Sequence, residues 1–228
     1  FPTADEYDPA GGLFVGETST LTISNPNPDG EIRFTLDGKQ PTIDSDLYEN
    51  SISIEKTTVV KAQIFEAGKS ISDISTGYFR VLKNKKGHGI SYKTYEKDEL
   101  VELPDFSTLK AKTSGTTLEF SLNNVNLPRE ESVAMVMESL IEVKKSGEYT
   151  FYLASDDGSK LYINNKEVVD NDGDHGVIER NGSIELEAGK HAIRVEWFNG
   201  GGGKWLGAFY QGPEIPKQII EPSILFKE

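Results

Sequence analysis

The sequence predicts an all-β fold of two tandem β-sandwiches: its apolar residues follow a two-residue period, turn signals interrupt them often, and a polar stretch divides the chain into two blocks. Apolar and polar residues alternate along short runs such as Ile32–Leu36 and Ile193–Trp197. Successive side chains of a strand point to opposite faces of a sheet, so this alternation indicates half-buried strands. Many short strands punctuated by 22 glycines and 10 prolines are typical of sandwiches.

Strands are predicted wherever the alternation persists, and turns where Asp-Gly, Asn-Gly or Ala-Gly follows. Asp37-Gly38 and Asp157-Gly158 are predicted hairpin turns, because glycine supplies the positive φ angles that tight turns need. Trp197 is in phase with Ile193 and Val195, so we expect it in the core. In chain order, the predicted strands cover residues 32–36, 57–65, 149–154, 160–163, 184–186 and 191–198.

The segment Arg129–Leu140 fits two structures. Its glutamates, alanine and methionines are good helix formers, and Pro128 is typical of a helix start. Val133, Met135, Met137 and Ile141 equally fit a strand if Ser139 is accepted on the buried face. Local pattern alone leaves both possibilities open.

A polar, charged stretch predicts the boundary between the two domains. Residues 84–87 (Asn-Lys-Lys-Gly) separate two alternating blocks, so we expect domains at 1–83 and 88–228 with 84–87 as the linker. The chain starts at Phe1 without an initiator methionine, and we expect it to be a piece of a longer polypeptide.

The composition excludes several classes of function. Against 24 Lys and Arg stand 37 Asp and Glu, giving a net charge of −13, which disfavours nucleic acids and anionic membranes. No apolar run is long enough for membrane insertion. The absence of cysteine excludes disulfides and thiolate chemistry. Hard cations and neutral partners such as sugars remain compatible with the charge.

Five aspartates within 19 residues suggest a calcium site. Clustered carboxylates are unfavourable unless they are solvated, protonated or joined by a cation, and oxygen ligands suit Ca²⁺. An EF-hand is excluded, because the glycine and glutamate that its loop requires are His175 and Asn181 here. The five aspartates are Asp156, Asp157, Asp170, Asp172 and Asp174.

The first block resembles the immunoglobulin-like C-terminal domain of chitobiases and β-hexosaminidases, over about residues 10–82. The resemblance rests on the runs Ile32–Thr42, Ser51–Ile54 and Thr57–Ala62. Members of this family are spacers beside catalytic domains of secreted sugar-cleaving enzymes. The resemblance therefore implies such a catalytic neighbour in the same polypeptide.

Residues 88–226 resemble the lectin-like sandwich named after the fourteen-kilodalton segment of anthrax protective antigen. The resemblance implies that Val133–Val143 is a strand. Its adhesin members bind calcium through two adjacent aspartates joined by a cis peptide and through a later asparagine. The runs that carry the resemblance are Ser146–Phe151, Ala154–Ile163, Val168–Gly173, Leu186–His191, Gly212–Ile215 and Pro222–Phe226.

Carried over to this chain, the resemblance implies that Asp156, Asp157 and Asn199 bind calcium. Carbonyl groups of Gly200–Gly203 would complete the coordination shell, and vicinal hydroxyls of a sugar would occupy the remaining positions. Trp205, expected to be exposed in the glycine-rich loop, would offer its ring to the sugar. Tyr162 and Tyr210 are alternative aromatic candidates.

Three interpretations of Asp156-Asp157 stay open at this point: an ordinary hairpin turn, a calcium site without sugar, and a calcium-dependent glycan site. We expect a non-catalytic accessory region of a secreted, periplasmic or cell-surface glycoside hydrolase, which binds glycan or polysaccharide through calcium. The alternatives are a ligand-free spacer that orients a catalytic domain, and an enzyme active by itself. No nucleophile elbow or paired histidines support the last.

Overall fold

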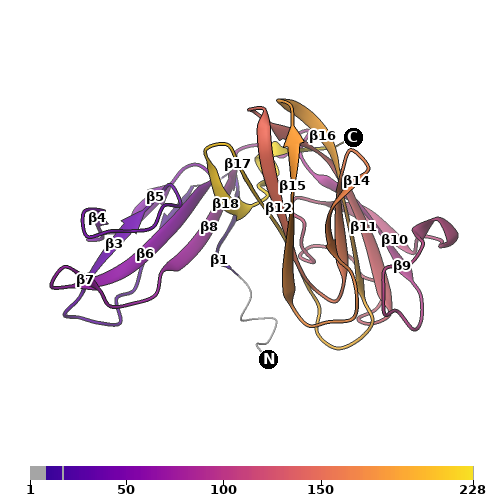
Figure 1. The fold of residues 1–228 in the computed structure, drawn as a ribbon, viewed down its shortest axis with the longest axis horizontal. Coiled ribbons are helices and arrows are strands. Elements are labelled where there is room, and N and C mark those ends of the chain that lie inside the picture. The colour runs from indigo at the N-terminus through magenta and orange to yellow at the C-terminus, as the bar shows by residue number, and fades with distance from the viewer. Residues whose placement is uncertain (1–8, 17, 228) are drawn as a thin grey trace. The chain divides into compact units, whose positions relative to one another are not determined.

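The computed structural model describes residues 9–16 and 18–227, which form two compact units. One unit extends to Lys85 and the other begins at Lys86. Throughout the described residues the regular structure is β-strand, with two single-turn 3₁₀ helices and no α-helix (Figure 1). The predicted all-β class is therefore confirmed. No helix among these residues has the length and apolar character of a membrane span.

The unit that ends at Lys85 contains one larger and one smaller sheet around a small core. Buried Ile54, Val60 and Phe79 lie at its centre. The larger sheet has the order β1 (Ala10–Val15), β8 (Ser75–Leu82), β6 (Thr58–Glu66), β3 (Glu31–Thr35) and β4 (Asp46–Leu47), with β7 (Lys69–Ser70) on β6, while β2 (Ser19–Leu21) pairs with β5 (Ile52–Ile54).

The tight hairpin predicted at Asp37-Gly38 is wrong. Strands β3 and β4 are antiparallel neighbours, but the chain between them runs from residue 36 to residue 45. The Gly38 amide donates to the carbonyl of Val59, and Asp37 accepts from the Lys39 amide. The Asp-Gly pair therefore ties a long loop to β6 instead of reversing the chain.

The unit that begins at Lys86 is a sandwich of two sheets around a large apolar core. Trp197, Tyr149 and Phe151 are fully buried in it, so the core position predicted for Trp197 is confirmed. One sheet has the order β10 (Thr113–Thr117), β9 (Ile90–Glu96), β11 (Val133–Val143), β16 (Gly189–Asn199), β13 (Ser159–Ile163) and β14 (Lys166–Asn171), with β19 (Leu225–Phe226) on β11; the other has the order β15 (Ile178–Leu186), β12 (Gly147–Asp156), β17 (Trp205–Gly212) and β18 (Ile215–Ile219).

The ambiguous segment is strand β11, which pairs with β9 and β16 and lies inside its sheet. Met135 and Met137 are fully buried on its inner face. Ser139 is tolerated on the same face because its hydroxyl lies 3.0 Å from the carbonyl oxygens of both Gly89 and Phe226. Burial between sheets thus overrides the local helix propensity.

Candidate functional site

Asp156 and Asp157 lie where the chain crosses from one sheet of the sandwich to the other. Strand β12 ends at Asp156 and pairs with β15 and β17, whereas β13 begins at Ser159 and pairs with β14 and β16. The two strands are not paired, so the interpretation of Asp157-Gly158 as a hairpin turn is wrong. The peptide bond between the two aspartates is cis, in agreement with the resemblance.

Gly158 is needed at this crossing because its surroundings leave no room for a side chain. A Cβ atom there would lie 2.6 Å from both the backbone nitrogen of Gly173 and the ring of Phe198. The glycine therefore serves close packing against the neighbouring loop and core.

The Asp157 carboxylate is buried and holds two backbone amides. The residue is only 3% exposed. Its Oδ2 accepts from the Gly200 amide at 2.8 Å, and its Oδ1 accepts from the His175 amide at 3.2 Å. Asp157 therefore connects the crossing to the residue directly after Asn199.

Both aspartates are held in surroundings that disfavour their charge. Burial raises the pKa of Asp156, and the negative charge of Asp157 raises it further, against the opposing effect of His175. Burial also raises the pKa of Asp157, which its bond from Gly200 opposes and the charge of Asp174 increases. A bound cation would relieve this unfavourable balance.

Asn199 ends β16 at the same end of the sandwich and is fully buried. Its Nδ2 donates to the carbonyl of Glu130 at 2.8 Å. Its Oδ1 is buried and has no hydrogen-bond partner among the described residues. An orphaned buried acceptor costs about 1–3 kcal/mol, and a cation bound there would satisfy it.

The loop after Asn199, Gly200–Gly203, lies against both aspartates, and we call it the glycine loop. A Cβ atom on Gly203 would lie 2.8 Å from the Asp156 carboxylate. A Cβ atom on Gly200 would collide with the carbonyl of Leu100. The carbonyl expected from Gly200 as a ligand accepts from the Ser132 amide at 3.2 Å, so its geometry is set by that bond.

Trp205 is not in the glycine loop, as the sequence suggested, but is the first residue of β17 and is half-buried. It lies opposite Asp156 in the pairing of β12 and β17, and its indole ring covers Gly207. Tyr210 is buried in the core, and the Tyr162 hydroxyl donates to Glu196 at 3.3 Å. Trp205 is thus the aromatic candidate that the fold places beside Asp156.

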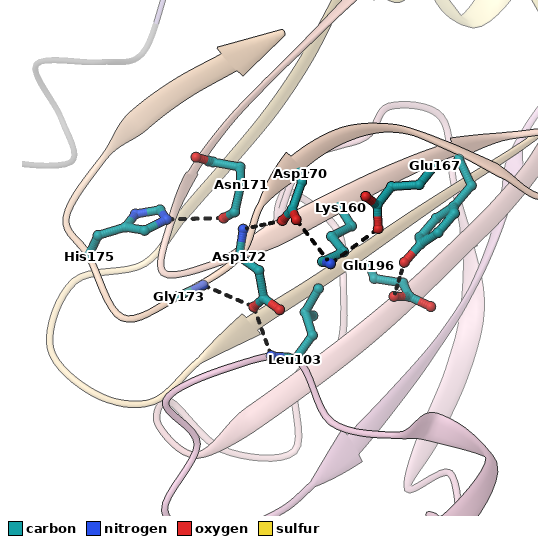
Figure 2. A network of polar contacts seen from close by, with 10 residues as sticks. Leu103, Lys160, Glu167, Asp170, Asn171, Asp172, Gly173, His175 and Glu196 are labelled. Carbon is teal, nitrogen blue, oxygen red and sulfur yellow. Dashed lines mark hydrogen bonds and ion pairs between the residues drawn. The ribbon is translucent and has the colours of Figure 1, made fainter. Parts of the chain in front are cut away.

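The other aspartates divide between two environments. Asp170 pairs with Lys160 at 3.2 Å, while Asp172 accepts from the amides of Leu103 and Gly173 (Figure 2). Asp174 acts electrostatically on Asp156 and Asp157. Asp170 and Asp172 are therefore committed to local structure.

The oxygen donors at this end of the sandwich suit a hard cation. They comprise the carboxylates of Asp156 and Asp157 and the orphaned Oδ1 of Asn199, and oxygen ligands favour calcium or magnesium. In the part of the chain that the structure describes, no three His, Cys, Asp or Glu side chains form a metal-binding group. The candidate set depends on the amide of Asn199.

One contributing segment was missed by the sequence reasoning. Glu130, Glu131 and Ser132 precede β11 and contact Asn199 and the glycine loop. The feature that points to this segment is its place directly before β11, because Val133, the first residue of that strand, lies opposite Asn199 in the sheet. That pairing becomes apparent only once the strand register is known.

Two family descriptions match the chain. The PA14 domain matches residues 86–223, and the chitobiase/beta-hexosaminidase C-terminal domain matches residues 9–76. The two matches follow one another along the chain in the same order as the two compact units.

Individual relatives cover different parts of the chain. Anti-sigma-I factor RsgI3 of Acetivibrio thermocellus is 30% identical over 90 residues, which are 39% of this chain and 14% of that protein. A solved anti-sigma factor domain-containing protein has a TM-score of 0.53 at 21% identity, covering 92% of this chain and 78% of its own. A PA14 sugar-binding domain from an RTX adhesin has a TM-score of 0.52 at 14% identity, covering 62% and 99%.

Proposed function

The chain belongs to the PA14 domain family over residues 86–223, after a chitobiase/beta-hexosaminidase C-terminal domain, and we propose that its second unit is a non-catalytic, calcium-dependent glycan-binding domain. The similarity to a PA14 sugar-binding domain of an RTX adhesin supports this proposal. The fold alone does not decide function, so the function has to be inferred from the chemistry of the site.

The orphaned Oδ1 of Asn199 is the observation that carries the proposal. A fully buried amide oxygen without a partner among the described residues lies at the same end of the sandwich as two aspartates with raised pKa values. Asp156, Asp157 and Asn199 would hold the ion, with backbone carbonyls of the glycine loop beside them. When bound, calcium supplies coordination positions that vicinal sugar hydroxyls can occupy in place of two waters.

Trp205 supports a sugar as the ligand. The residue is half-buried and lies opposite Asp156 in the pairing of β12 and β17, and an aromatic face packs well against the apolar side of a sugar ring. The chain as a whole has a net charge of −13, which favours neutral glycans over uronic acids or phosphorylated sugars as ligands.

Calorimetry with calcium and a panel of neutral glycans tests the proposal. We expect calcium binding, calcium-dependent heat with at least one glycan, and loss of both in Asp156→Ala. Asp170→Ala is the matched control, because it removes an aspartate that pairs with Lys160. Unchanged calcium binding in Asp156→Ala would refute the proposed site. If calcium binds but no glycan gives a heat of binding, the domain is a spacer stabilised by a metal ion and not a glycan-binding domain.

Two larger proteins could contain this region. The sequence resemblance implies a glycoside hydrolase, whereas the match to an anti-sigma-I factor favours a sensor exposed outside the cell, in which glycan binding would act on a transcriptional regulator. In either setting we propose that residues 9–85 serve as a spacer. The remainder of the reading frame distinguishes the two, and aryl-hexosaminide turnover by residues 1–228 would contradict a non-catalytic role.

A further inference from the structure

Four successive glycines should be the most mobile part of the candidate site, yet a neighbouring segment holds them. Glycine loses more conformational freedom on folding than any other residue, so a glycine loop needs external contacts to stay in one conformation. Glu130–Ser132, which we call the clamp, supplies these contacts from the residues just before β11.

The clamp contacts the loop and both of its flanking residues. The carbonyl of Glu130 accepts from Nδ2 of Asn199 at 2.8 Å, and the Glu130 carboxylate pairs with Lys204. The Ser132 amide donates to the carbonyl of Gly200 at 3.2 Å. The Glu131 carboxylate accepts from the Gly202 amide at 3.4 Å, which places a side-chain acceptor of the clamp at the middle of the loop.

The clamp is itself held in place by the residue that precedes it, Arg129. The Arg129 guanidinium donates to the carbonyl of Ser132 and pairs with Asp98 at 2.9 Å. On its other side the loop is fixed by the bond from the Gly200 amide to Asp157. The glycine loop therefore lies between the clamp and the two aspartates, with contacts on both sides.

We propose that the clamp is a positioning element of the binding site, and that Glu131 is the positioning residue that orders the glycine loop before any ligand arrives. The loop carries no side chains, so its backbone can act in recognition only if its conformation is fixed beforehand. The consequence for ligand affinity rests on the proposed function. The ordering of the loop does not.

The test compares Glu131→Ala, Glu131→Gln and Glu185→Ala in residues 1–228. Glutamine keeps the oxygen that accepts from Gly202, whereas alanine removes it, and Glu185 is an exposed residue of the edge strand β15. Hydrogen exchange of the Gly202 amide is measured by NMR in metal-free protein. We expect it to become about fivefold faster in Glu131→Ala, the equivalent of one net hydrogen bond, and to be unchanged in the other two variants.

Calcium affinity is measured on the same variants by calorimetry, with the melting temperature as a check on folding. We expect Glu131→Ala to weaken calcium binding by about fivefold at an unchanged melting temperature, and Glu131→Gln to restore it. An unchanged hydrogen-exchange rate of the Gly202 amide in Glu131→Ala would overturn the proposal that Glu131 orders the glycine loop, whatever ligand the protein binds. If the wild type binds no calcium, the proposed function fails. The hydrogen-exchange measurement on Gly202 then still decides whether Glu131 orders the glycine loop.

Discussion

At the scale of single residues, the candidate site depends on backbone approach as much as on side-chain chemistry. Asp157 uses both carboxylate oxygens to hold backbone amides of two loops. Gly203 lies so close to Asp156 that any side chain would displace that carboxylate. A methyl group added at Gly201, in contrast, would meet only Glu131, at an ordinary contact distance of 3.8 Å. The four glycines are therefore not equivalent.

Alanine substitutions should separate these glycines. We expect Gly203→Ala to weaken calcium binding by about tenfold, or roughly 1.4 kcal/mol, because its methyl group forces Asp156 out of place. Gly201→Ala should leave the affinity within about twofold. Calorimetry with calcium measures both, and equal effects of the two variants would contradict this account of the loop.

Glu196 provides a second prediction, on pH dependence. Burial raises the pKa of this carboxyl above its ordinary 4.5, against the opposing effects of Arg194, Tyr162 and Lys160. As pH falls through the raised pKa of the folded state, Glu196 takes up a proton in the folded protein. The unfolded protein binds the same proton only when the pH reaches about 4.5, so between these two pH values protonation favours the folded state. The contribution of Glu196 to stability is thus present at low pH and is lost as pH rises through the folded-state pKa.

Urea unfolding of wild type and Glu196→Gln at a series of pH values tests this. We expect the wild type to gain stability relative to the variant as pH falls from about 7 toward about 4.5, with a slope of at most about 1.4 kcal/mol per pH unit. A difference that is constant over this range, or that has the opposite sign, would rule out a raised pKa for Glu196.

The sequence identified single residues of the site better than their contacts. Asp156, Asp157 and Asn199 follow from a family resemblance, and the fold brings them to one end of the sandwich. The orphaned Oδ1 of Asn199 and the contacts of Glu131 depend on side-chain direction and strand register, which one sequence does not specify. Trp205 was expected to be exposed in the glycine loop, whereas it begins strand β17 and is half-buried.

At the scale of elements, β11 connects the core to the candidate site. Its inner face is buried, and its first residue lies opposite Asn199. The helix propensity of this segment opposes its actual structure, so its conformation is set by pairing with β9 and β16. Only the family resemblance predicted the strand, because the local sequence fits a strand by its two-residue period and a helix by its residue propensities equally well.

Truncation on the inner face of β11 should therefore be costly. We expect Met137→Ala to lower the free energy of unfolding by about 2–5 kcal/mol, because the side chain is fully buried and leaves a cavity. Glu142→Ala on the same strand should cost about 1 kcal/mol or less, the range of a cross-strand pair. Urea unfolding measures both, and similar losses would argue against a packing role for Met137.

At the scale of the whole molecule, every candidate site residue lies in the unit that begins at Lys86. This unit has its own large apolar core and can be expected to fold alone. Periodicity and composition predicted a sandwich architecture, and the polar stretch between two alternating blocks, with the two family resemblances, predicted two such domains. The sequence did not predict that the chain would change sheets at Asp157, because non-local pairing is invisible to a two-residue period.

Residues 86–228 expressed alone should bind calcium as tightly as residues 1–228, to within about twofold. The reason is that the clamp, the glycine loop and the three candidate ligands all belong to this unit. Calorimetry on the two proteins side by side gives the comparison. A loss of about tenfold or more in the shorter protein would mean that the preceding unit contributes to the site.

The indole of Trp197 links the centre of the core to the candidate site. Trp197 is fully buried, and its Nε1 donates to the carbonyl oxygen of Asp156 at 3.1 Å. The other tryptophan of the chain, Trp205, lies opposite the same aspartate. One indole is therefore bonded directly to Asp156, and the other belongs to the residue paired with it, so the intrinsic fluorescence of the protein should respond to ligand binding at that aspartate without an added label.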